Sequence, residues 1–330
     1  MQKTAHPFPK SEVAIGLAEL DRYAKGWLLD SEIRQLSPGT LASRRLVVEK
    51  LLWFLRQQEL STCGTMELRQ FLAYLTNSHE SEGGRWGNDR RRRRMRPSSI
   101  GMYYGRLRTL FRFLVDEGIL EASPMESVRP PVVRSDQVQP FTQAQINALL
   151  QAAKRSNHPR RDEAILLILL DTGLRASELC SLKMKDVDLP GRRCIVLGKG
   201  NKRRAVYFGR DTTKAIWNYL KEQERDDEDP LFYSDRGTRK GEAMTRSGLL
   251  QLFERLGKVA KVEATRCSPH TCRHTFAVEF LRGGGNTFAL MQLLGHTSLK
   301  MTNRYVALAQ ADIEHQHRQY SPVDRLRSRR

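Results

Sequence analysis

The segment LLGHTSLKMTNRY, residues 293–305, ends on a tyrosine that could be a nucleophile or an ordinary aromatic residue on a helix. A phenol has an ordinary pKa near ~10, so covalent chemistry at Tyr305 would need neighbours that stabilise the phenolate. His296 stands nine residues earlier in the same segment. The segment has neither a pattern of metal ligands nor a glycine-rich phosphate loop. The reactivity of Tyr305 therefore depends on residues elsewhere in the chain.

Two motifs upstream carry charged side chains that could assist such chemistry. In DTGLRASELCSL, Arg175 and Glu178 are three residues apart on an expected helix, where they could do no more than pair with each other. In GKGNKRR, Lys199 lies in an expected turn, and a lysine at the tip of a hairpin usually serves solubility. Each of these residues alone is weak evidence for a catalytic site.

A third motif, SPHTCRHTF, has the composition of a helix start. Ser268 suits the N-cap and Pro269 suits the first helical position. His270 and Arg273 then fall on one face in the first turns of the helix, because they are three residues apart. This motif therefore presents a histidine and an arginine side by side, ahead of the segment that ends on the tyrosine.

In chain order, the arginine, lysine, His-x-x-Arg, histidine and tyrosine residues resemble the pattern of the tyrosine recombinase family, also called the phage integrase family. The motifs that carry the resemblance are TGLRASEL, GKGNKRR, SPHTCRHTFA and LLGHTSLKMTNRY, and they cover roughly residues 140–320. Residues 10–130 resemble the family only by helix pattern and position, where it carries a helical core-binding domain. Met301 departs from the family, which commonly has a small hydroxyl residue there.

The resemblance implies a site-specific DNA recombinase that cleaves and rejoins DNA through a 3′-phosphotyrosine intermediate, without metal or ATP. Guanidinium groups suit the nonbridging oxygens of a phosphodiester because they donate two hydrogen bonds and stay charged. Histidines can add donors, and a lysine can protonate the 5′ oxygen that leaves. Glu178 would orient this cluster. The implied catalytic residues are Arg175, Lys199, His270, Arg273, His296 and Tyr305.

Other interpretations of these residues stay open. A type IB topoisomerase uses a similar cluster to nick and reseal DNA, and a catalytically inactive DNA-binding regulator could keep the motifs. Tyr320, in HRQYSPVD, is a rival nucleophile beyond the motif. Cys267, His270, Cys272 and His274 could suggest zinc, but they lack a matched second pair of ligands. The acidic run RDDEDP could suggest a metal-dependent nuclease, although a solvated loop is the simpler interpretation.

The charge of the chain points to a polyanionic partner. The 330 residues include 56 lysines and arginines against 37 acidic residues, for a formal net charge of +19. A charge of this size opposes compaction, so we expect a double-stranded DNA site as the partner. The loop SEGGRWGNDRRRRRMRPSS could track phosphates or be a solvated loop. The expected DNA-binding residues are Arg90, Arg91, Arg92, Arg93, Arg94, Arg96, Lys202, Arg203 and Arg246.

Cysteine usage and hydropathy indicate the compartment. The five cysteines are odd in number and contain no CxxC pair, which argues against a disulfide framework and fits a reducing cytoplasm. The N-terminus lacks the long apolar core of a signal peptide, and no apolar run is long enough for a membrane span. We therefore expect a cytoplasmic, nucleoid-associated protein without a membrane partner. We expect no cofactor and no metal site.

The scaffold that positions these residues is expected to be mainly α-helical with a small antiparallel β element. Apolar residues within 68–75 and 103–114 recur at helical spacing, so residues 1–130 should form a helical bundle, the SAM-like core-binding domain that the resemblance implies. The proline-containing residues 131–140 are the expected linker. Residues 141–330 are then the mixed, mostly helical catalytic domain with its C-terminal tail.

Two local signals place elements in the catalytic domain. Thr142 and Gln145 have the spacing of a capping box, which predicts the start of a helix. Two strands are predicted over Ile195–Leu197 and Ala205–Phe208, joined as a hairpin by the turn rich in glycine and lysine. Lys199 would lie in that turn.

The residues after Tyr305 bear on assembly. They carry a short apolar stripe, and they could fold back on their own domain. The resemblance implies instead that this tail docks on a neighbouring protomer in a homotetramer on two DNA sites. A second recombinase or a directionality factor would be a further partner. Integration or excision of a mobile element and Xer-type resolution of multimers are both compatible with the sequence.

Overall fold

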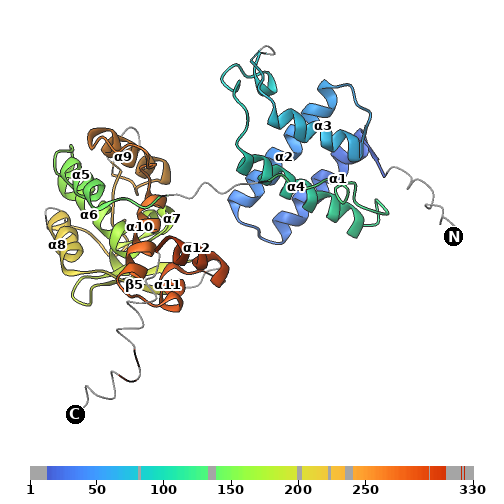
Figure 1. Cartoon of the computed structure of the whole chain (residues 1–330). Helices are drawn as coiled ribbons and strands as arrows, with labels where there is room; N and C mark the ends of the chain where they lie inside the picture. Colours follow the sequence, from blue (N-terminus) through green and yellow to red (C-terminus); the bar gives the residue numbers. More distant parts are fainter. Residues whose placement is uncertain are drawn as a thin grey trace. The chain divides into compact units, whose positions relative to one another are not determined.

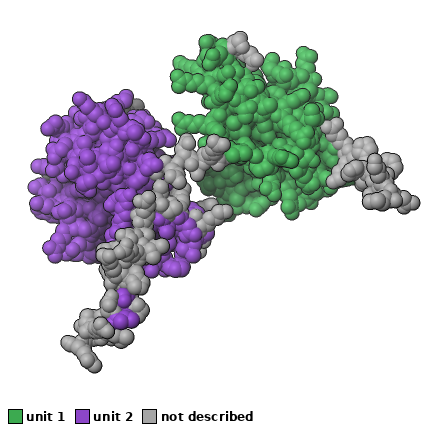
Figure 2. Space-filling view, in the orientation of Figure 1, with its two compact units in different colours: residues 1–136 green, residues 137–330 purple. Residues whose placement is uncertain are grey.

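The computed structural model divides into two compact units, unit 1 over Met1–Asp136 and unit 2 over Gln137–Arg330 (Figure 2). Each unit has its own hydrophobic core. No helix among the described residues is long and apolar enough to cross a membrane. The structure describes residues 13–80, 83–132, 139–198, 203–221, 224–234, 241–296, 298–309, 321 and 323.

Unit 1 is a helical bundle whose first helix is tied to a later loop by a short antiparallel ladder (Figure 1). The ladder pairs Ile15 with Cys63. Ser37 accepts a hydrogen bond from the Thr40 amide and Pro38 follows it, as expected at a helix start. In chain order the described elements are β1 (Ile15–Gly16), α1 (Leu17–Ile33), α2 (Pro38–Gln57), β2 (Thr62–Cys63), α3 (Thr65–Thr76), the 3-10 helix η1 (Arg85–Gly87) and α4 (Pro97–Asp116).

The core of unit 1 confirms the apolar stripes that the sequence predicts. Of the nine apolar residues at helical spacing in these two segments, eight are buried and Leu72 is half-buried. Full burial of one leucine or phenylalanine side chain contributes roughly 1.5–3 kcal/mol to stability. The bundle is therefore held by its apolar faces, as helical spacing requires. The buried stripe residues are Leu68, Phe71, Leu75, Tyr103, Leu107, Leu110, Phe111 and Leu114.

Unit 2 is also mostly helical, with one small sheet. Helix α6 packs against α5, α8 and α10, and α10 packs in turn against α11 and α12 (Figure 1). The capping box of Thr142 and Gln145 is confirmed at the start of α5. The described helices are α5 (Gln143–Lys154), α6 (Pro159–Thr172), α7 (Ala176–Ser181), the 3-10 helix η2 (Met184–Asp186), α8 (Arg210–Leu220), α9 (Arg246–Val259), α10 (Pro269–Arg282), α11 (Thr287–Leu294) and α12 (Leu299–Ala309).

The sheet of unit 2 is antiparallel in the order β3-β4-β5. Its strands are β3 (Val187–Asp188), β4 (Arg193–Leu197) and β5 (Arg203–Tyr207). The hairpin is confirmed, but its predicted bounds are wrong, because both strands begin two residues earlier and β5 ends one residue earlier. The edge strand β3 was not predicted. The strand starts were placed too late because the charged residues Arg193 and Arg203 do not look like strand residues. Strand β3 is too short to show alternation of apolar and polar residues.

A glycine at the end of α6 brings three parts of the unit together. Gly173 has a left-handed φ of 62°, and a side-chain carbon there would lie 2.4 Å from Phe276 and 2.9 Å from Leu294. Any other residue would be strained at this φ and would have to displace the side chains of Phe276 on α10 and Leu294 on α11. Arg175, two residues further on, then lies beside the end of α11.

Candidate active site

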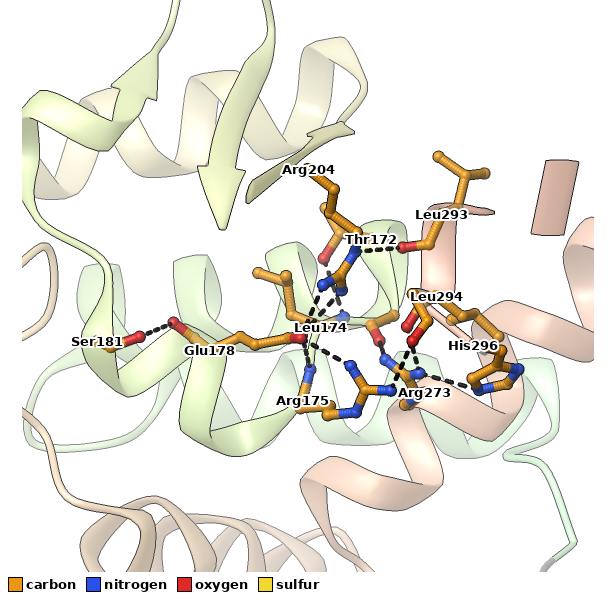
Figure 3. A network of polar contacts seen from close by, with 12 residues as sticks. Thr172, Leu174, Arg175, Glu178, Ser181, Arg204, Arg273, Leu293, Leu294 and His296 are labelled. Carbon is orange, nitrogen blue, oxygen red and sulfur yellow. Dashed lines mark hydrogen bonds and ion pairs between the residues drawn. The ribbon is translucent and has the colours of Figure 1, made fainter. Parts of the chain in front are cut away.

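A buried carboxylate forms the base of the site. Glu178 is 4% exposed and accepts four hydrogen bonds from two arginines. Arg175 donates through its amide at 2.8 Å and its Nη1 at 2.8 Å. Arg204 of β5 donates through Nη1 at 2.8 Å and Nη2 at 2.9 Å. Both carboxylate oxygens are therefore satisfied, and the orientation of the carboxylate is fixed (Figure 3).

The electrostatics of Glu178 follow from this arrangement. Burial alone would raise the pKa of the carboxyl group, but the hydrogen bonds from Arg204 and from the Arg175 backbone outweigh burial, and the pKa lies below its ordinary value. Glu178 is therefore an anion held between two cations. This geometry supports an orienting role rather than a proton-transfer role.

Three arginines donate to three successive carbonyls at the C-terminal end of α11 (Figure 3). The last carbonyls of a helix have no partner within the helix, so these donors satisfy them. The positive charge of the arginines also interacts favourably with the negative end of the helix dipole. The arginines come from β5, α10 and the turn before α7, and they meet at one helix end. The bonds run from Arg204 Nε to Leu293 O at 2.9 Å, from Arg273 Nη2 to Leu294 O at 2.7 Å and from Arg175 Nη2 to Gly295 O at 3.2 Å.

The two arginines that the sequence singled out differ in exposure. Arg273 is 3% exposed, and its Nη1 donates to the carbonyl of Gly173 at 2.7 Å. Burial, followed by the charge of Arg175, lowers the pKa of Arg273 to about 10, so it remains a cation at neutral pH. The Arg175 side chain is 33% exposed. An anion from solvent can therefore reach Arg175 more easily than Arg273.

His296 connects Arg273 to α12. Its Nε2 lies 3.1 Å from Arg273 Nη2, which can only donate, so Nε2 accepts. The neutral ring then carries its proton on Nδ1, which donates to Thr302 Oγ1 at 2.9 Å. In this state His296 is an acceptor toward the arginine. Donation from Nε2 to a phosphate requires that this nitrogen be protonated.

Tyr305 lies inside the unit rather than at its surface. Its side chain is 0% exposed and belongs to a small apolar cluster with residues of α10 and α11. Its ring lies nearly parallel to that of His296, at 6.2 Å between centroids, and meets the edge of His274 at 5.1 Å. The tyrosine is thus close to the arginine and histidine cluster, but it is covered.

His270 and His274 form a pair on α10. Their Nε2 atoms are 2.9 Å apart, so one ring donates and the other accepts. His270 is exposed, and His274 is buried next to Tyr305. The helix starts as predicted, because the Ser268 side chain accepts from the Thr271 amide and Pro269 follows it. The histidine pair therefore connects the surface, at His270, with the buried tyrosine, which His274 contacts.

The groups considered as metal ligands have other partners. Across the described ranges, no cluster of three or more histidine, cysteine, aspartate or glutamate residues could hold a metal ion. Cys272 is completely buried, and burial raises the pKa of its thiol. In the acidic run, Glu228 accepts hydrogen bonds from Lys183, at 2.7 Å, and from Lys185, which lower its pKa to about 2. Glu228 is therefore paired with two lysines, and Cys272 is enclosed in the core.

The other predicted residues of unit 2 fall into two groups. Lys199 and Lys202 lie outside the described residues. Arg203 on β5 and Arg246 at the start of α9 are exposed. Tyr320 also lies outside the described residues. The structure therefore brings Arg175, Glu178, Arg273, His296 and Tyr305 together at one site.

The arginine-rich loop of unit 1 has a defined backbone. Arg85 is buried, and its Nη2 donates to the carbonyls of Asn77 at 3.2 Å and Arg93 at 2.8 Å. The side chains of Arg90–Arg94 and of Arg96 are exposed. The loop thus presents a row of guanidinium groups from a backbone that is fastened to unit 1.

Sequence reasoning missed Arg204, Thr302 and the contact of His274 with the tyrosine. A signal for Arg204 was present. Side chains alternate along a strand, and the burial of Val206 places Arg204 on the inner face of β5. A charged residue on that face needs a partner, and Glu178 is that partner. No sequence signal identifies Thr302, because its partner is set by the turn after α11.

Comparison with known proteins matches the sequence of this chain to a family. The model of the phage integrase family matches residues 139–312. The tyrosine recombinase XerC of Pelobacter propionicus is 32% identical over 283 residues, covering 82% of this chain and 85% of the relative. The tyrosine recombinase XerD of Yersinia pestis is 31% identical over 298 residues, covering 88% and 93%.

Solved structures show the same fold. The Tn1549 transposon integrase in complex with a circular intermediate DNA superposes with a TM-score of 0.66 at 21% identity, over 92% of this chain and 99% of that one. A lambda integrase dimer bound to a core site gives a TM-score of 0.65 at 20% identity, over 87% and 97%.

Proposed function

The chain belongs to the phage integrase family, and on that premise we propose that Tyr305 attacks a DNA phosphate that Arg175 and Arg273 bind. The enzyme is a tyrosine site-specific recombinase, which breaks and rejoins DNA strands. The observation that carries the assignment is the meeting of four elements at the end of α11. Residues far apart in the sequence place two guanidinium groups, an imidazole and a phenol within one cluster.

The arginines would act on the charge of the phosphodiester. In the structure, Arg175 Nη2 and Arg273 Nη2 donate to neutral carbonyls. A phosphate oxygen is a stronger acceptor than a carbonyl because it is charged, so these donors can turn to it. Negative charge grows on the nonbridging oxygens during attack, and fixed cations stabilise that charge most. His270 and a protonated His296 would add further donors.

The bond changes balance without an external energy source. The Tyr305 oxygen forms a bond to phosphorus, the bond from phosphorus to the 5′ oxygen breaks, and the phenol proton passes to water. Lys199 supplies a proton to the leaving 5′ oxygen as general acid. The phosphotyrosine keeps the energy of the phosphodiester, so a 5′ hydroxyl of another strand can reverse the steps and rejoin DNA.

The burial of Tyr305 gives this reaction a prior step. A phenol that is 0% exposed cannot reach a phosphate, so α12 has to leave its position against α10 and α11. Burial of such a side chain contributes roughly 1.5–3 kcal/mol to the stability of the packed position, and DNA binding or contact with a neighbouring protomer can offset the cost of releasing it. Release of α12 would therefore limit cleavage to assembled complexes.

The proposed substrate is a pair of double-stranded DNA sites held by a homotetramer. Both units carry exposed arginines, among them Arg96 in unit 1 and Arg203 in unit 2, that suit a duplex backbone. Xer-type resolution of multimers is the favoured role, because the two curated relatives described above are Xer recombinases. Integration or excision of a mobile element is the second candidate, favoured by the fold shared with the Tn1549 integrase.

The test starts from the DNA that the protein traps. Cells that produce the protein are lysed under denaturing conditions, and DNA attached to the protein is sequenced to identify the site. Two copies of that site in one plasmid should then yield a deletion product. Relaxation of supercoils without exchange would instead indicate a topoisomerase, and absence of any covalent adduct would indicate an inactive regulator.

A further inference from the structure

Arg204 holds the site together although the proposed chemistry does not use it. Its guanidinium donates to both oxygens of Glu178 and to the carbonyl of Leu293, so three donors are engaged at 2.8–2.9 Å (Figure 3). Its side chain is 15% exposed, against 33% for Arg175. A phosphate from solvent therefore meets Arg175 before it meets Arg204.

The space for Arg204 is made by a residue without a side chain. Gly295 has a left-handed φ of 61°, and a side-chain carbon there would lie 3.1 Å from Nη1 and 3.2 Å from Cζ of Arg204. The guanidinium thus packs against the backbone that leads into His296. Arg204 touches both the partner of Arg175 and the turn that carries the histidine.

We propose that Arg204 is a positioning residue that keeps Arg175 and the end of α11 in the geometry for binding the scissile phosphate. Glu178 shares each of its oxygens between the two arginines. Without Arg204, a buried carboxylate loses two donors and attracts the remaining cation more strongly. The Arg175 guanidinium then turns to form a two-bond fork with Glu178, and its Nη2 leaves Gly295 and the phosphate.

Arg204 also anchors the hairpin that carries Lys199. It pairs with Val196 in the β4–β5 ladder, close to the turn after Leu197. Its bonds to Glu178 and Leu293 fasten this ladder to α7 and α11. Loss of Arg204 therefore disturbs phosphate binding first, through Glu178, and loosens the hairpin second.

The test rests on the proposed function and uses the full-length protein with its DNA site. Arg204→Gln and Arg204→Lys are compared with Arg193→Gln, because Arg193 is an exposed arginine on the neighbouring strand whose side chain pairs with Asp188. Covalent adduct is measured in single-turnover reactions, with thermal melting as a check of folding. Each protein is tested on ordinary DNA and on DNA with a methylphosphonate at the scissile position, whose centre is neutral before attack and so carries one negative charge fewer than a phosphodiester for the arginines to stabilise.

We expect Arg204→Gln to slow adduct formation roughly 10- to 100-fold on ordinary DNA, the effect of one lost charge-assisted contact, with duplex affinity retained. The ratio of wild-type to variant rate should shrink to within a few-fold on the methylphosphonate. Arg204→Lys should fall between wild type and Arg204→Gln, and Arg193→Gln should match wild type.

Two results would overturn the inference: a wild-type rate for Arg204→Gln, or equal defects on both substrates. If Arg204→Gln does not fold, Arg204→Lys carries the same comparison, and failure of both to fold would make Arg204 a structural residue only. A wild-type protein that forms no adduct would refute the proposed function itself.

Discussion

Replacement of Arg175 by lysine separates charge from geometry at the site. Lysine keeps a positive charge beside Glu178 but loses the planar fork of donors. In the structure Nη1 donates to Glu178 at 2.8 Å and Nη2 donates to Gly295 at 3.2 Å. A single ammonium group can keep the ion pair and lose the carbonyl. Stability should therefore fall by about 1 kcal/mol, the usual net value of one such hydrogen bond.

The effect on catalysis should be larger than the effect on stability. In the transition state the variant loses one charge-assisted hydrogen bond to the phosphate, which costs about 1.5–3 kcal/mol. Cleavage should then slow roughly 10- to 150-fold, at about 1.4 kcal/mol for each tenfold change. Duplex affinity should stay nearly constant, because the number of positive charges is unchanged.

The assay measures single-turnover adduct formation at saturating protein and duplex affinity in the same buffer. Arg193→Lys is the matched control, since Arg193 lies on β4 outside the cluster and pairs with Asp188. If the affinity and the cleavage rate of Arg175→Lys fall in proportion, Arg175 is a binding residue and the transition-state argument is refuted.

Three further predictions concern DNA binding, proton transfer and assembly. Replacement of Arg90–Arg94 by glutamine should lower the slope of log affinity against log salt by up to about 4 to 5. An unchanged slope would indicate that these arginines are solvated and do not contact DNA. Substitution is preferred to deletion because the carbonyl of Arg93 accepts a hydrogen bond from Arg85. Lys199→Ala should be slow on normal DNA but near wild type on DNA with a 5′ bridging sulfur, which leaves without a proton; equal defects would remove its role as general acid. Truncation after Gln310 should spare single-site binding and abolish paired-site complexes, and intact paired-site complexes would exclude the tail as the assembly element.

Local signals in the sequence predicted where the helices begin and which faces they bury. Ser268 with Pro269 set the start of α10, and helical spacing set the core of unit 1. These features depend on neighbours within about four residues, so spacing alone reveals them. The pairing of Arg175 with Glu178 was foreseen for the same reason, as one of two possible outcomes.

The long-range contacts of the site could not be read from spacing. Arg204 and Glu178 are 26 residues apart, and only the fold brings them together. Three charged residues, Lys199, Lys202 and Arg203, stand within five positions before Arg204, so charge alone did not distinguish the inward-facing arginine from its neighbours. Strand alternation could have done so once the strand bounds were known.

The burial of Tyr305 likewise depends on tertiary packing. The sequence offers a tyrosine that could be a nucleophile or a packed aromatic, and in the structure the ring is packed. A packed aromatic and a nucleophile are compatible interpretations, because the same side chain can be buried in the core before the reaction and exposed for it. The cost of release is set by α10 and α11, which the spacing of the motif does not describe.

The most direct test of the central claim is the covalent adduct formed by Tyr305→Phe. This change removes a single oxygen, and the wild-type protein, Tyr305→Phe and Tyr320→Phe are compared on the same DNA in a denaturing gel. Wild type and Tyr320→Phe should form the adduct at equal yield, and Tyr305→Phe should bind DNA with wild-type affinity and form none. An adduct at wild-type yield in Tyr305→Phe would contradict the assignment of Tyr305 as the nucleophile.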